Sequence, residues 1–271
     1  MLKYTSNITG EDILYLHFQK TGGFSFYNII NQKGIEQEYF MEHRGYINIP
    51  DEYSNIRKIG FIRNPYSWYV SFYFFHMGKP DSTRNFDLGS LKTVKPNTAA
   101  IRDLPLKSIP REFNCSPFVE ALTMDKKSGF DQFVRNASNL KDFFQNNPHM
   151  YEFFIIRMKS YIEFGHSWYS TWFKNADQFQ LELKVEDMDM SLMQWYANVI
   201  GVSNAEVEVF KLENFKDVIT SEFGSAFVEP HKNSSEHSEF RHYYNEETSG
   251  MIYLADKAIF DKFNYNQLHL K

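Results

Sequence analysis

Two short segments of the sequence place cations, glycines and hydroxyls in the spacing with which proteins bind phosphate groups. The first reads KTGGFS over residues 20–25 and follows an apolar run at 12–18. Glycines between a strand and a helix let backbone N–H groups surround an anion, and the positive end of the helix adds attraction. Lys20 adds a point charge there, and Thr21 and Ser25 add hydroxyl donors. The pattern predicts an anion site, with a tight turn that carries an exposed lysine as the alternative.

The second segment reads GFIRNPY over residues 60–66 and ends an apolar run with an arginine. Pro65 then suits the first turn of a helix, because its missing N–H and fixed φ cost nothing there. Ser71 lies eight residues beyond Arg63, about two helical turns along. A guanidinium that donates two hydrogen bonds and a serine hydroxyl at this spacing are predicted to hold one phosphate. The alternative is that Arg63 pairs with a surface carboxylate and that Ser71 is an ordinary helix residue.

The order of residues in the first segment argues against a nucleotide triphosphatase or a nucleotide kinase. Those enzymes use G-x-x-x-x-G-K-[ST], in which the lysine follows the glycines and the hydroxyl holds magnesium. Here Lys20 precedes both glycines. A nucleotide kinase-like phosphotransferase is therefore kept only as an alternative function.

The scaffold predicted for these segments is an α/β fold, formed as a single domain over residues 1–271. Expected strands at 12–18, 58–62 and 179–185 are separated by helices, which indicates a mostly parallel central sheet flanked by helices. The first segment would form a P-loop-like strand, loop and helix. Further helices are expected from Pro65 and near 129–145, 150–174, 190–200, 236–244 and 246–261. Residues 77–128 hold five of the nine prolines and show little periodicity, so we expect an irregular insertion that shapes the acceptor site.

The composition excludes several functional classes. A net charge of −5 argues against a general nucleic-acid binder, which needs a broad basic face. The single cysteine, Cys115, excludes an internal disulfide and a cysteine-based zinc site, and the spacing of the histidines matches no common ligand pattern, so no metal is expected. No apolar segment is long enough for a membrane span, and no signal peptide is visible, so we expect a cytoplasmic protein.

Taken together, the two segments resemble the donor-binding motifs of sulfotransferases that use 3′-phosphoadenosine-5′-phosphosulfate (PAPS). LYLHFQKTGGFS is similar to their 5′-phosphosulfate loop, and FIRNPYSWYVSFY is similar to their 3′-phosphate strand and helix. Residues 231–265 are similar to the carbohydrate-modifying, Golgi-type branch of the family. The donor contacts that the resemblance implies are Lys20, Thr21, Gly22, Gly23, Phe24, Ser25, Arg63 and Ser71, with Lys232 and Arg241 as additional candidates. Phe24 departs from the family pattern, which usually has threonine at this position.

The resemblance implies an in-line transfer of the sulfuryl group from PAPS to a hydroxyl or an amine, with adenosine 3′,5′-bisphosphate as the leaving group and no metal. Lys20 would neutralise charge on the leaving phosphate. The catalytic base would follow the loop and its helix, where His43 is favoured because an unperturbed histidine has a pKa of about 6.5. Glu36, Glu38 and Glu42 are the alternatives. The acceptor would be a small molecule or a carbohydrate, and a catalytically inactive nucleotide-binding relative is the third functional hypothesis.

Overall fold

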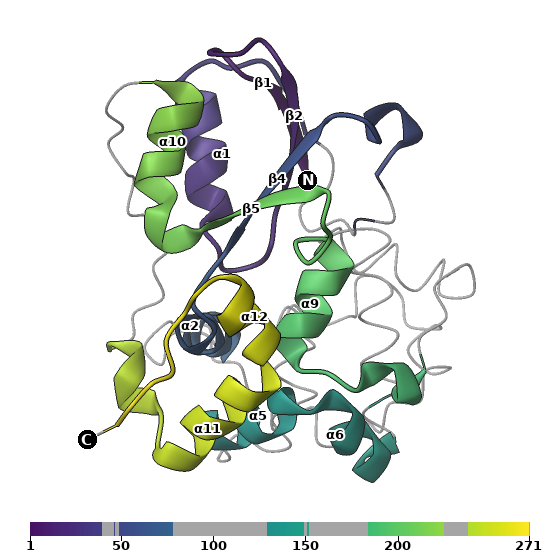
Figure 1. Cartoon of the computed structure of the whole chain (residues 1–271), viewed down its shortest axis with the longest axis vertical. Helices are drawn as coiled ribbons and strands as arrows, with labels where there is room; N and C mark the ends of the chain where they lie inside the picture. Colours follow the sequence, from purple (N-terminus) through teal and green to yellow (C-terminus); the bar gives the residue numbers. More distant parts are fainter. Residues whose placement is uncertain are drawn as a thin grey trace, which may run out of the picture.

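The computed structural model describes residues 1–39, 46, 49–77, 129–148, 151, 184–224 and 238–270, which form a five-stranded sheet with helices packed on both faces (Figure 1). The strands are β1 (Leu2–Thr5), β2 (Asp12–Leu16), β3 (Gln37–Tyr39), β4 (Arg57–Ile62) and β5 (Val207–Lys211). Their order across the sheet is β3-β1-β2-β4-β5.

Three neighbouring strands, β2, β4 and β5, run parallel, whereas β1 runs antiparallel to both β2 and β3. The prediction of a mostly parallel sheet is therefore confirmed for its centre, and one edge is mixed. Four of the five residues in β2 and five of the six in β4 are buried. Continuous burial of this kind is typical of strands that are covered on both faces.

The α-helices of the described part of the chain are α1 (Gly23–Gln32), α2 (Pro65–Met77), α5 (Gly129–Ser138), α6 (Leu140–Asn146), α9 (Leu192–Ile200), α10 (Phe215–Phe223), α11 (Glu246–Ala255) and α12 (Lys257–Lys262). Short 3₁₀ helices are η2 (Asp51–Tyr53), η6 (Val185–Met188), η7 (Leu212–Asn214) and η8 (Phe240–Tyr243). Within this part of the chain, no helix is both long and apolar enough to cross a bilayer.

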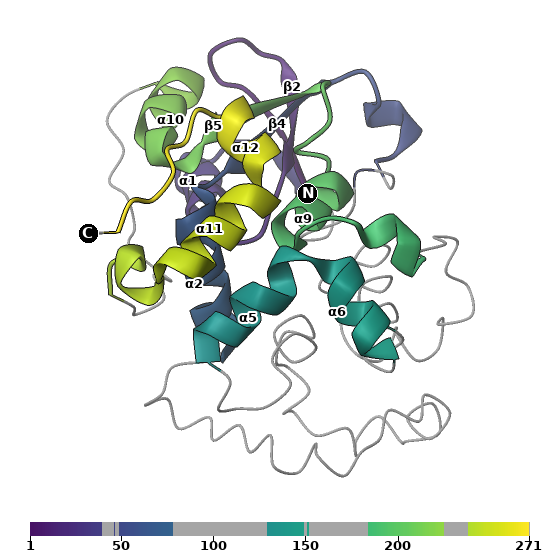
Figure 2. The ribbon, with the colours of Figure 1, turned by 60° about the horizontal axis from the view of Figure 1, so that its bottom comes forward.

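Two apolar cores hold the helices to the sheet. One joins the apolar faces of α1 and α10 to the sheet, and these two helices lie side by side in Figure 1. The other and larger core joins α2, α5 and α9 with the C-terminal helices. Figure 2 shows α5 and α11 beside α2, in agreement with their mutual contacts.

Most of the predicted elements are present, with changed limits. The predicted strands at 12–18 and 58–62 are β2 and β4, and the helices predicted after the glycines and from Pro65 are α1 and α2. The predicted helices at 129–145 and 246–261 are each divided into two. The helix predicted at 236–244 is only the 3₁₀ helix η8, and Val185, the last residue of the strand predicted at 179–185, begins η6 instead. Residues 179–183 of that strand, nearly all of the helix at 150–174 and nearly all of the insertion at 77–128 lie outside the described residues.

Candidate functional site

Lys20 and Arg63 follow adjacent parallel strands and emerge at the same edge of the sheet. In the register of β2 against β4, Leu16 pairs with Gly60, so the chain leaves both strands at a similar level. In parallel α/β sheets, ligands bind beyond the carboxyl ends of the strands. The positive charge of Arg63 also contributes to lowering the pKa of Lys20, which means that the two cations act on one another. The sheet therefore brings the two sequence motifs together.

The loop between β2 and α1 has a strained, closely packed backbone. Lys20 adopts φ = 64° and Gly22 adopts φ = 79°, in the left-handed region that favours glycine. A Cβ on Gly22 would also lie 2.7 Å from Leu212, and one on Gly23 would overlap the ring of His17. Both glycines of the motif are thus required by the packing of the loop. His17 is buried in this packing.

Thr21 acts inside the loop. Its side chain is buried, and the hydroxyl donates to the Phe18 carbonyl at 2.6 Å. This bond closes the turn, so the Thr21 hydroxyl faces the protein and not the solvent side of the loop. The sequence had assigned this hydroxyl to the ligand.

The first turn of α1 offers backbone donors. Gly22 is the N-cap and provides no side-chain hydrogen bond, so the amides that follow it have no capping acceptor. Ser25 is half-buried in this turn, whereas the Phe24 ring is 45% exposed. Uncapped amides at a positive helix end attract anions. The glycine turn leads directly into α1, and the Phe24 ring adds apolar surface where a hydroxyl was expected.

The ammonium of Lys20 is half-buried under an aromatic ring. The Phe75 ring of α2 lies 3.8 Å from Nζ, in a cation–π contact. Burial, and to a lesser degree the charge of Arg63, lowers the pKa of Lys20 to about 8. No ion pair of Lys20 exists among the described residues.

Arg63 is half-buried as well, and its guanidinium Nε donates to Ser67 Oγ at 2.7 Å. Burial lowers the pKa of Arg63, against the opposing effect of the Glu213 carboxylate. Glu213 nevertheless lies beyond ion-pair distance, and none of the described carboxylates pairs with Arg63. Burying a cation without an ion-pair partner raises the free energy of the folded state, and binding of an anion lowers it again. Two half-buried cations at one end of the sheet, which pair with no described carboxylate, are suited to binding an anion.

Ser67, and not Ser71, is the serine bound to Arg63. Ser71 lies one turn further along α2 and is 4% exposed. It does not line the cavity that contains Arg63. The expectation that Ser71 shares a phosphate with Arg63 stays a prediction, and the structure adds Ser67 as a direct partner of the guanidinium.

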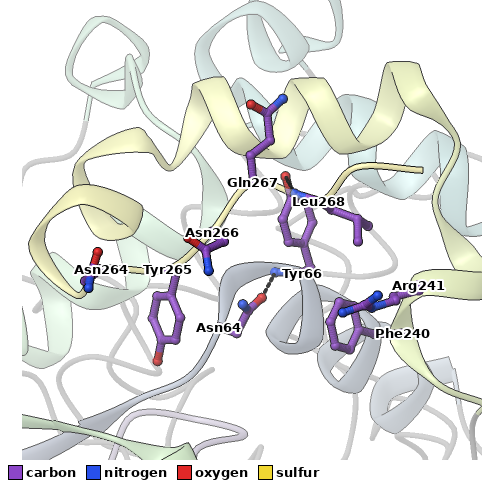
Figure 3. A pocket seen from close by; sticks show the side chains of 9 residues that line it. All are labelled: Asn64, Tyr66, Phe240, Arg241, Asn264, Tyr265, Asn266, Gln267 and Leu268. Atoms are coloured by element: carbon purple, nitrogen blue, oxygen red, sulfur yellow. Dashed lines mark hydrogen bonds between the residues drawn. The ribbon is translucent and has the colours of Figure 1, made fainter. Parts of the chain in front are cut away.

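A cavity of about 380 Å³ opens at Arg63. It is lined by Arg63, Asn64, Ser67, Leu212, Glu213, Phe240 and Tyr265. A second cavity of about 240 Å³ shares Asn64, Phe240 and Tyr265 with the first, so the two adjoin. Figure 3 shows the residues that line this second cavity, among them Asn264, Asn266 and Gln267 and the rings of Tyr66 and Phe240. The two rings are parallel within 2°, with centroids 6.5 Å apart. Lys20 lines neither cavity.

Glu213 orders one wall of the cavity at Arg63. One of its oxygens accepts the Asn64 backbone N–H at 3.0 Å, and the other accepts the Tyr265 hydroxyl at 2.8 Å. The side chain of Asn64 caps α2 by accepting the Tyr66 N–H at 3.0 Å, as Figure 3 shows. Burial and the Glu213 carboxylate raise the pKa of Tyr265. The strand end, the start of α2 and the C-terminal segment are thereby held in one arrangement.

The predicted catalytic base is not located by the structure. His43 and Glu42 lie outside the described residues. Glu36 and Glu38 are exposed, and Glu38 on the edge strand β3 accepts the Tyr53 hydroxyl at 2.8 Å. Within the described ranges, no group of three or more metal-ligating side chains is present.

Of the two additional donor contacts predicted from the sequence, only Arg241 is described. Arg241 lines the second cavity and pairs with Glu239 at 3.2 Å, whereas Lys232 lies outside the described residues. Glu213, Phe240 and Tyr265 were not foreseen at all. Of the residues missed, only Ser67 lies close in sequence to its partner, in the first turn of the helix that follows Arg63.

Comparisons with protein-family models, curated proteins and solved structures gave no match. Any function is therefore proposed from the chemistry of the cavities beside Arg63 and of the two half-buried cations.

Proposed function

We propose that this protein is a sulfotransferase that moves a sulfuryl group from PAPS to a hydroxyl or an amine of an acceptor. The observation that carries the proposal is the pair of half-buried cations, Lys20 and Arg63, which end adjacent strands and pair with no described carboxylate. A ligand with two separated anionic groups neutralises both. PAPS is such a ligand, and the resemblance of both motifs to donor-binding segments supports this choice.

In this proposal Arg63 and Ser67 hold the 3′-phosphate, and the adjoining cavity receives the nucleoside. The half-buried Phe240 ring, which is parallel to the buried Tyr66 ring, offers a flat apolar face, and the amide side chains of Asn264, Asn266 and Gln267 offer donors and acceptors. Stacking of a base on an aromatic side chain contributes roughly 1–3 kcal/mol. Lys20 and the first-turn amides of α1 hold the 5′-phosphosulfate.

The transfer itself needs orientation and charge neutralisation. The acceptor atom forms a bond to sulfur while the bond between sulfur and the bridging phosphate oxygen breaks, and the electron pair stays on that oxygen. Lys20 and the loop amides are the groups we assign to stabilise this growing charge. With a pKa of about 8, Lys20 is mostly protonated at neutral pH and carries the charge that this role needs. The acceptor proton passes to a base, for which His43 is the candidate retained from the sequence.

The binding test uses adenosine 3′,5′-bisphosphate without magnesium. Titration calorimetry and thermal unfolding should show binding and a raised Tm, because a ligand that binds only the folded state stabilises it. Arg63→Ala should weaken binding by at least tenfold. Arg135→Ala is the matched control, since Arg135 forms an exposed ion pair with Glu247 away from the cleft. No stabilisation at millimolar ligand would refute the proposal.

A second candidate is a nucleotide-binding protein without catalysis, and two observations favour it. The exposed Phe24 replaces a hydroxyl donor in the loop, and Phe75 covers the ammonium that the reaction uses. Such a protein would bind the bisphosphate but would not transfer label from ³⁵S-PAPS to a broad panel of hydroxyl and amine acceptors. Transfer that is lost in Lys20→Ala would exclude it.

A further inference from the structure

Helix α2 contacts both of the cations that the sheet brings together. At its start, Ser67 accepts a hydrogen bond from Arg63. The next residue, Trp68, donates to the loop that carries Lys20, and two turns later Phe75 covers the Lys20 ammonium. A rigid helix that contacts two sites fixes their separation.

The contact made by Trp68 is fully buried. Its indole N–H donates to the Gln19 carbonyl at 2.9 Å, and its ring stacks on Phe18 with centroids 5.6 Å apart and planes 9° apart. The Tyr196 hydroxyl of α9 donates to the side-chain oxygen of Gln19 at 3.1 Å. The two residues that precede Lys20 are thus held by α2 and α9.

The Gln19 carbonyl belongs to the peptide unit that links Gln19 to Lys20. Rotation of this unit about the N–Cα bond of Lys20 is the φ angle of Lys20, which stands at 64°. A non-glycine residue stays in the left-handed region only when its surroundings hold it there. Trp68 supplies a directional bond to this peptide unit, and Thr21 closes the turn on the other side.

We infer that Trp68 is a positioning residue: its indole N–H holds the Gln19–Lys20 peptide and so sets where the Lys20 ammonium lies relative to Arg63. The inference rests on the proposed function only in taking one ligand to span both cations. The local consequence, the placement of Lys20, can be measured without any nucleotide.

The experiment compares the wild-type protein with Trp68→Phe, which keeps an aromatic ring against Phe18 and removes the donor. Lysines are dimethylated with ¹³C-formaldehyde, the Lys20 signal is assigned from Lys20→Arg, and its pKa is read from the pH dependence of the chemical shift. In the wild type this pKa should be about 8, as burial and Arg63 require. In Trp68→Phe it should rise towards the ordinary lysine value, because the released loop lets the ammonium move away from Arg63 into water.

A second measurement separates positioning from general damage to the site. Adenosine 3′-monophosphate engages only the Arg63 end, whereas the 3′,5′-bisphosphate engages both ends. Trp68→Phe should bind the monophosphate as the wild type does and lose roughly tenfold in bisphosphate affinity, which is about one hydrogen bond to a charged group. Tyr69→Phe is the control, since this neighbouring buried aromatic loses a hydroxyl that accepts the Met193 N–H and, among the described residues, makes no hydrogen bond to the loop.

An unchanged Lys20 pKa in a folded Trp68→Phe protein would overturn the inference, whether or not nucleotides bind. A raised Lys20 pKa in a protein that binds neither nucleotide would support the role of Trp68 and refute the proposed sulfotransferase function. If Trp68→Phe does not fold, Tyr196→Phe replaces it, since this variant loses the other buried bond to Gln19. It should raise the Lys20 pKa in the same direction by a smaller amount, and no shift there would overturn the inference.

Discussion

The charge state of Lys20 links pH to anion binding. Its folded-state pKa of about 8 is below the ordinary lysine value, so the ammonium loses its proton as the pH rises through about 8. Only the cation attracts the 5′-phosphate. We therefore expect bisphosphate affinity, measured by calorimetry above the phosphates' own second pKa of about 6, to weaken roughly tenfold between about pH 7 and about pH 9.

Lys20→Arg is the control for this pH dependence. An arginine keeps its charge throughout this range. The variant should therefore show a nearly flat affinity over the same range, whatever its absolute affinity. An equally steep decline in both proteins would assign the titration to another group.

The two serines of α2 give a second prediction at the scale of single residues. Ser67→Ala removes the acceptor of the 2.7 Å bond from Arg63 and leaves the guanidinium less well oriented. It should weaken binding of adenosine 3′-monophosphate by about five- to tenfold, the value of one hydrogen bond to a charged group. Ser71→Ala should have the smaller effect, because Ser71 is buried away from the cavity. The opposite ranking in calorimetry would restore the assignment made from the sequence.

At the scale of elements, the start of α1 depends on a glycine. A Cβ on Gly23 would overlap the His17 ring, so Gly23→Ala should destabilise the protein by roughly 1–3 kcal/mol through overpacking. Gly250 lies inside α11, and a Cβ there would meet nothing within 4 Å. Gly250→Ala should therefore stabilise the protein by up to about 1 kcal/mol, because alanine loses less entropy in a helix. Urea unfolding of both variants tests whether the same substitution gives opposite signs.

The elements that the sequence predicts best are those with a strong local pattern. Strands β2 and β4 are continuous apolar runs, and Pro65 marks the start of α2. Strand β1 has only four residues and β3 only three, too short for a reliable alternation. Strand β5 and helix α10 were not predicted at all.

The same distinction applies to the site. Lys20 and Arg63 stand in local motifs, and their meeting follows from the parallel pairing of two strands. Glu213 reaches Asn64 from 149 positions away, and Tyr265 reaches Glu213 across 52 positions. No local periodicity encodes contacts of that range, because they depend on how the C-terminal segment packs against α2.

At the scale of the whole molecule, one buried acid joins distant parts of the chain. Asp256 accepts a hydrogen bond from Ser191, the N-cap of α9, and lies between α11 and α12 near the Tyr69 hydroxyl of α2. The surrounding titratable groups are the buried or half-buried tyrosines Tyr66, Tyr69 and Tyr244. Burial raises the pKa of Asp256 to about 7, against the two hydroxyls that lower it.

The sign of the resulting pH dependence is fixed. Between the unfolded pKa of about 4 and the folded pKa of about 7, the folded state binds more protons than the unfolded state. The free energy of unfolding should therefore fall as the pH rises through this window, by a few kcal/mol in total. Asp256→Asn should remove this dependence in urea unfolding at pH 5 to 8. Asp261→Asn, at an exposed pair with Lys257, should keep it.

The ring of Phe75 over Lys20 has a consequence for which anions the cleft accepts. A free phosphate or chloride must displace the Phe75 ring and gains only the attraction of the Lys20 ammonium in return. A ligand already bound at Arg63 holds its other anionic group near the Phe75 ring at a high effective concentration. Displacing the ring therefore reduces its binding free energy far less. In the proposed function, the Phe75 ring would therefore favour anions with two separated charged groups over small single anions.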